Sequence, residues 1–162
     1  MRIPAPAADR ADHASAFRAV TAVSQARTPR EWTRIVFEGA PTPLAVFVRF
    51  GWRNVLRFRL SDSPASVAGW RLADADEDSA VLEAHSPLLE ARNVAFVDDD
   101  GVTWATYVRF HGRVGRAVWA IAARLHHVVL PYLLRRAVRR TERSLRLGGV
   151  NATSVTSATV RA

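Results

Sequence analysis

The chain has 162 residues, a size that one domain with a substantial core explains most economically. Apolar residues make up 49% and charged residues 23%, which are globular values and argue against global disorder. The absence of cysteine excludes disulfides, thiolate metal sites and a cysteine nucleophile. All 23 basic residues are arginine, which also excludes lysine-based Schiff-base chemistry, and the net charge of +8 could favour anionic partners.

The two ends of the chain differ in composition from its middle. Residues 1–12 are rich in Ala and Pro, and residues 148–162 are low in complexity, so we expect both segments to be disordered. A single domain is then predicted over residues 13–147. The first residues contain no apolar signal-peptide core, and a cytoplasmic location is the default expectation.

The first part of this domain predicts a strand and then a helix. Residues 14–24 carry β-branched residues and one aromatic, a pattern that favours a strand. Thr28 is a predicted N-cap, with Pro29 at the first helical position and Glu31 at the capping-box position. The helix should end near Gly39.

A second helix is predicted over residues 43–59. On it Arg49, Arg53 and Arg57 recur at every fourth position and therefore form one row. Such a row could bind an anion or could simply face solvent, and solvent exposure is the commoner case.

From residue 66 onward the hydrophobic period changes towards two, which is typical of strands. The acidic run at 98–101 is a strong hairpin signal, and we expect an antiparallel meander with short turns. Strands are predicted at 67–75, 80–86, 89–97 and 102–110.

The stretch 111–140 predicts one long helix with an apolar face that we expect to cover the core. A membrane span over 117–134 is the rival interpretation. The central Arg124 and a polar side carrying His127 argue against that span. The apolar face consists of Val114, Val118, Ile121, Leu125, Val128, Val129 and Tyr132, with Trp119 and His126 on its flank.

The order of one strand, two short helices, several strands and a long helix resembles the helix-grip fold. In that α+β fold a curved antiparallel sheet wraps around a long C-terminal helix. The segment HGRVGRAVWAIAARLHHVVLPYLLRR at 111–136 is similar to a bacterial domain-of-unknown-function family within the polyketide cyclase/START-like (SRPBCC, Bet v 1-like) superfamily. Members carry a Gly-Arg pair leading into the helix, here Gly115-Arg116 or Gly112-Arg113, and a later His, here His126. Where the family usually has Pro before this His, the chain has Arg124-Leu125.

This resemblance implies a mostly apolar cavity between sheet and helices that binds a small hydrophobic molecule. The expected lining residues are Trp70, Trp104, Val108, Phe110, Trp119 and His126. His126 is also the best candidate for a catalytic residue, as a general base or hydrogen-bond donor, although a purely structural His remains the alternative. Glu83 and His85 share one strand face and could form a pair, or could be solvated on the outer face.

No nucleophile elbow, zinc-helix motif or phosphate loop occurs, so we expect no metal and no cofactor. Three functions remain open. The first is a binding or carrier domain without chemistry, and the second is a cyclase- or dehydratase-like enzyme acting on a carbonyl substrate in the same cavity. The third is peripheral binding to anionic lipid or nucleic acid through the arginines at 135–146, with no specific nucleic-acid motif and at most weak membrane contact.

Overall fold

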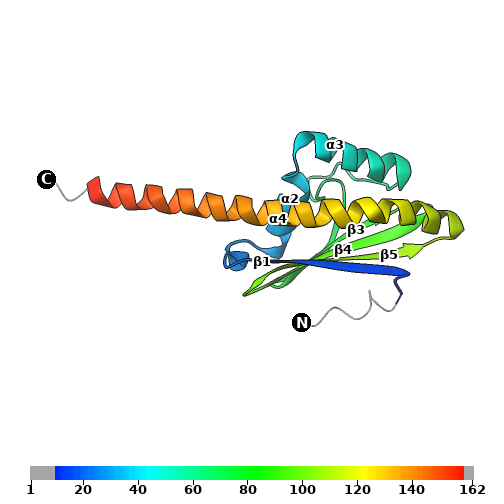
Figure 1. Ribbon diagram of the computed structural model, residues 1–162, viewed down its shortest axis with the longest axis horizontal. Helices are drawn as coiled ribbons and strands as arrows, with labels where there is room; N and C mark the ends of the chain where they lie inside the picture. The colour runs from blue at the N-terminus through cyan, green and yellow to red at the C-terminus, as the bar shows by residue number, and fades with distance from the viewer. Residues whose placement is uncertain (1–9, 159–162) are drawn as a thin grey trace.

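The computed structural model describes the backbone of residues 10–158 and the side chains of residues 10–148. It shows an α+β protein in which one antiparallel sheet has helices packed on one side (Figure 1), which confirms the predicted class. In the sheet order β1-β5-β4-β3-β2, the strands are β1 (His13–Val20), β5 (Gly101–Phe110), β4 (Leu89–Asp98), β3 (Ser79–His85) and β2 (Arg71–Ala75). The helices are α2 (Pro29–Glu38), α3 (Thr42–Phe50) and α4 (Arg113–Ala158).

The two end segments lie only partly within the described residues. At the start, the Asp12 backbone N–H donates to the Val108 carbonyl over 2.9 Å, and the Asp12 carboxylate accepts from the Phe110 N–H. At the other end α4 is helical to Ala158 and projects beyond the sheet (Figure 1). The boundary that we placed at residue 147 therefore falls inside a continuous helix. Residues 1–9 and 159–162 of the two predicted disordered segments lie outside the described part.

The meander is confirmed at β3, β4 and β5, each within one residue of its predicted ends. The strand predicted at 67–75 begins only at Arg71, because residues 67–70 form a tight turn in which Val67 and Trp70 exchange two backbone hydrogen bonds. The strand predicted at 14–24 ends at Val20, because a short 3₁₀ turn, η1 (Ser24–Ala26), follows.

Strand register places a polar row in the middle of the helix-facing side of the sheet. Thr106 on β5 pairs with Ser15 on β1 and with Asn93 on β4. The next row on the same face is apolar, since Trp104 pairs with Ala95. Side chains of register partners point to the same face, so the polar residues meet beneath the helices.

The start of α2 has the predicted capping box. The Glu31 backbone N–H donates to Thr28 Oγ1 over 3.2 Å, and the Glu31 carboxylate accepts from the Thr28 N–H over 2.8 Å. Such a cap contributes about 1 kcal/mol. One turn on, Trp32 is fully buried, and its indole N–H donates to the Ser24 carbonyl.

The second predicted helix is shorter than its pattern indicated. α3 ends at Phe50, a π-helical turn η2 (Gly51–Val55) follows, and the chain is no longer helical at Arg57, whose φ is 56°. The predicted row of three arginines on one helix is therefore wrong at Arg57. Despite its apolar sequence, α3 has no buried residue.

The long helix α4 packs on the sheet, but of the apolar face that we predicted it to bury only Val118 and Val129 pack against the core. Of the expected apolar face, Val114 is 64% exposed, Ile121 74% and Val128 68%. The buried side lies further round the helix and includes Trp119, Leu130, Leu133, Leu134, Ala137 and Val138. The apolar arc of α4 is wider than the area that the sheet covers, so one part of it stays exposed.

Gly115 explains how the first turn of α4 approaches the sheet. A Cβ at this position would overlap the Leu88 carbonyl oxygen in the β3–β4 turn. The same carbonyl accepts a hydrogen bond from the His111 N–H over 2.9 Å. Only glycine allows this close contact of the two backbones without displacing either.

Candidate functional site

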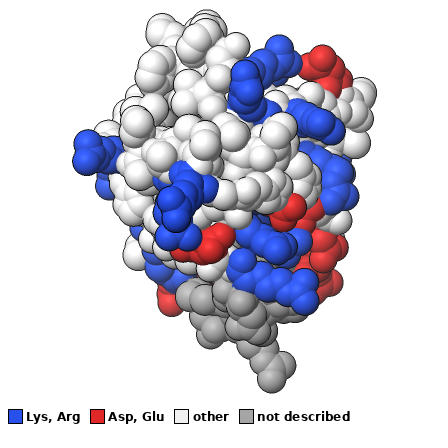
Figure 2. All heavy atoms as spheres, turned by 90° about the vertical axis from the view of Figure 1, so that its right-hand side faces the viewer, with Lys and Arg blue, Asp and Glu red and all other residues white. Residues whose placement is uncertain are grey.

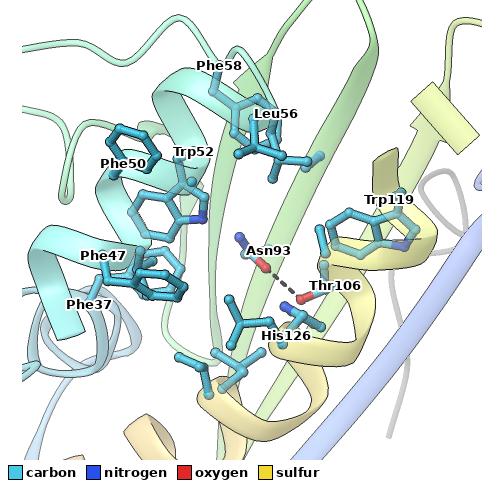
Figure 3. A pocket seen from close by; sticks show the side chains of 18 of the residues that line it. Phe37, Phe47, Phe50, Trp52, Leu56, Phe58, Asn93, Thr106, Trp119 and His126 are labelled. Carbon is cyan, nitrogen blue, oxygen red and sulfur yellow. Dashed lines mark hydrogen bonds between the residues drawn. The ribbon is translucent and has the colours of Figure 1, made fainter. Parts of the chain in front are cut away.

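A cavity of about 300 Å³ lies between the pair α3–η2 and the helix α4, above the helix-facing side of β4 and β5 (Figure 3). Its volume is at the lower end of those typical of small-molecule sites. Phe47, Phe50 and Trp52 border it on one side and Trp119 and His126 on the other (Figure 3).

The walls of the cavity are predominantly apolar. On the α3–η2 side, aromatic rings pack edge to face: the ring centroids of Phe37 and Trp52 lie 5.1 Å apart, and those of Trp52 and Trp70 5.4 Å apart. Among the residues whose side chains the structure describes, no Asp, Glu, Arg or Tyr contributes to the lining. Apart from indole N–H groups, its polar side chains are Asn93, Thr106 and His126. The site therefore suits an apolar molecule with few polar atoms.

Asn93 presents a hydrogen-bond donor to this cavity. Its Oδ1 accepts from the Trp104 indole N–H over 3.1 Å and from the Thr106 hydroxyl over 2.6 Å. An indole N–H can only donate, so the atom facing it must be the amide oxygen. The amide nitrogen consequently points the other way, towards the cavity, as Figure 3 shows.

His126 is a second polar group of the cavity, and its imidazole contacts a side chain of β1. Its Nε2 lies 3.3 Å from the Ser15 hydroxyl. Burial lowers the pKa of His126 to about 4, and repulsion from the neighbouring His127 and His13 adds to this effect. Its imidazole is therefore neutral near pH 7 and can donate or accept one hydrogen bond at each nitrogen.

The structure brings together only part of the residue set expected from the sequence. Trp70, Trp119 and His126 line the cavity. Val108 and Trp104 are fully buried and do not border it, although Trp104 lies directly behind Asn93 and positions it. Phe110 lies outside the lining and packs beneath the Arg116 guanidinium, whose carbon is 5.8 Å from the ring centroid.

Glu83 and His85 lie on the opposite side of the sheet from the cavity. The Glu83 carboxylate is buried and forms ion pairs with Arg71 and Arg92, whereas His85 Nε2 is 4.0 Å away from it. The sequence left open whether Glu83 and His85 pair or are both solvated on the outer face, and for Glu83 the solvated alternative is wrong. The carboxylate instead joins β2, β3 and β4 on the outer face.

Sequence reasoning missed Asn93, Thr106 and the aromatic residues of α3 and η2. A signal for the first two was present, because each is the polar member of an otherwise apolar strand row. On β4 that row is Leu89, Ala91, Asn93, Ala95 and Val97. A lone amide inside such a row indicates either a buried hydrogen-bond network or a ligand contact.

Comparisons with protein-family models, with curated proteins and with solved structures found no match to this chain.

Proposed function

We propose that this protein binds a small, uncharged, hydrophobic molecule in the cavity between α3 and α4, as a binding or carrier domain of the helix-grip type. The helix-grip assignment is supported by the element order and by β1 pairing with β5 at the edge of an open sheet on which α4 packs. The observation that carries the functional proposal is the cavity itself, with its apolar lining and the Asn93 amide nitrogen that faces into it.

The polar groups favour a ligand with a hydrogen-bond acceptor. The Asn93 amide nitrogen can donate to a carbonyl or ether oxygen, and neutral His126 can donate or accept nearby. A carboxylate ligand is disfavoured, because the described lining residues include no arginine that would offset the loss of its hydration. A ketone, an aldehyde or an ester fits these conditions best.

The enzymatic alternative, a cyclase- or dehydratase-like activity, has weaker support. Enolisation of a carbonyl substrate needs a base and a group that stabilises the developing oxyanion. His126 could act as the base, but among the described residues no arginine or tyrosine lines the cavity, which leaves the neutral Asn93 amide as the donor to an oxyanion. Binding without chemistry therefore remains the primary proposal.

Asn93→Leu is expected to weaken binding of decanone about tenfold, the cost of one hydrogen bond, while decane binding stays within about twofold. Competition against a hydrophobic fluorescent probe measures both affinities in the same protein. Unchanged decane binding shows that the variant is folded, and Asn54→Leu, at an exposed asparagine outside the lining, is the matched control. Equal loss for decanone and decane would contradict the assigned role of the amide.

A further inference from the structure

The fold leaves unexplained a set of exposed apolar side chains on α3 and α4. On α3, Val46 is 64% exposed, Phe47 54% and Phe50 60%. On α4, Ile121 is 74% exposed and Val128 68%. Single exposed apolar residues are normal, but a contiguous group of this kind marks an interaction site. We call this group the apolar rim.

The apolar rim surrounds the mouth of the cavity. Phe47, Phe50 and Ile121 belong both to the rim and to the cavity lining, so the two surfaces are continuous. Val46 and Val128 lie on the rim but do not line the cavity. Contact with the rim and binding inside the cavity can therefore be tested separately.

The charged residues on the two segments that carry the rim are all arginines. There is no Asp or Glu in residues 39–61 or in residues 101–141, the two segments that contain the rim. Arg49, Arg113, Arg116 and Arg124 are exposed and form no ion pair with any described residue, whereas Arg53 pairs with Asp62 over 3.5 Å. Figure 2 shows an uncharged expanse at the top, where α3 lies, bordered mainly by blue basic side chains, with a red acidic side chain beside them at the upper right.

We propose that the apolar rim docks on an anionic lipid surface, with Val46, Phe50 and Val128 entering the acyl boundary and the flanking arginines contacting lipid phosphates. Apolar residues bordered by arginine are the pattern of helices that lie in the plane of a membrane interface. A second copy of the chain is a poorer occupant, because each copy would bring the same unpaired positive charges to the contact.

The composition of α4 agrees with docking in the plane of the interface. By length and composition α4 could cross a membrane, and 22% of its most apolar 18-residue window is buried. Core helices of soluble proteins share such lengths and compositions. A spanning orientation would expose Leu130, Leu133 and Leu134 and separate them from the body of the fold, whereas in-plane docking leaves that packing intact.

Co-sedimentation of the full chain with vesicles tests this inference. The protein should bind phosphatidylcholine vesicles that contain phosphatidylglycerol, and bind pure phosphatidylcholine vesicles far more weakly. The double variant Val46→Glu/Val128→Glu should lose binding by about tenfold or more. Arg49→Gln and Arg124→Gln should each lower it about fivefold. Val20→Glu, at a 77% exposed valine on β1, is the matched control and should bind like the wild type.

The proposal is overturned if the glutamate double variant sediments as well as the wild type, or if no vesicle composition binds the protein. Light scattering that shows a dimer lost in the double variant, together with no vesicle binding, would assign the rim to self-association instead. The inference does not depend on the cavity ligand. A glutamate double variant that loses vesicle binding but still binds decanone would show that the two surfaces act separately. A wild-type protein that binds vesicles but not decanone would support docking and contradict the cavity proposal.

Discussion

Replacing Trp104 by alanine is expected to lower the free energy of unfolding by about 3–5 kcal/mol. Trp104 is fully buried in the middle of β5, and its ring centroid lies 4.9 Å from that of Phe37 on α2. The change removes one of the two fully buried tryptophans of the described core, the other being Trp32 on α2. It also removes one of the two donors to Asn93 Oδ1, leaving only the Thr106 hydroxyl.

Equilibrium unfolding in urea measures this loss. Val20→Ala, at an exposed position of β1, is the control and should change the free energy of unfolding by no more than about 0.5 kcal/mol. A loss below about 1 kcal/mol for Trp104→Ala would mean that the aromatic layer between sheet and α2 packs more loosely than the structure shows.

Acidification is expected to destabilise the protein through His126. Its folded-state pKa of about 4 lies below the unfolded value of about 6.5, so the unfolded chain binds a proton that the folded protein does not. The stabilising contribution is thus fully present above pH 6.5 and is lost as the pH falls towards the folded pKa. The total loss is roughly 3 kcal/mol.

Urea unfolding at several pH values between neutrality and mild acid tests this expectation. His126→Gln should have a clearly flatter pH profile than the wild type, because the group that takes up the proton on unfolding is gone. The same change at exposed His85 controls for loss of a histidine as such. Parallel profiles for the wild type and His126→Gln would contradict the burial of a neutral imidazole. His13, whose pKa is also lowered by burial and by His127, remains in both proteins.

The sequence was sufficient to predict elements whose signals are local. The capping box at Thr28 and the hairpin at Asp98 depend on residues within a few positions of each other, and the structure confirms both. The period of two beyond residue 66 likewise predicted the strands β3, β4 and β5. Such patterns follow from backbone geometry alone.

The buried arc of α4 could not be predicted from the sequence, because it depends on where the sheet lies. At about 100° per residue, Ile121 and Leu130 lie on opposite sides of the helix, and both sides carry apolar residues. Only contact with the sheet decides that Leu130 is buried and Ile121 exposed. For the same reason the sequence could not predict the apolar rim or the mouth of the cavity. Both depend on how α3 and α4 are placed beside each other on the sheet.

The central claim is that the space between α3 and α4 holds a hydrophobic guest molecule, and filling that space tests it most directly. Ala122 on α4 lines the cavity, whereas Ala120 two residues earlier is exposed and does not. Titration with decanone should show saturable binding to the wild type and to Ala120→Trp, and at least about tenfold weaker binding to Ala122→Trp. Equal binding by both tryptophan variants, or no saturable binding by the wild type, would contradict the claim.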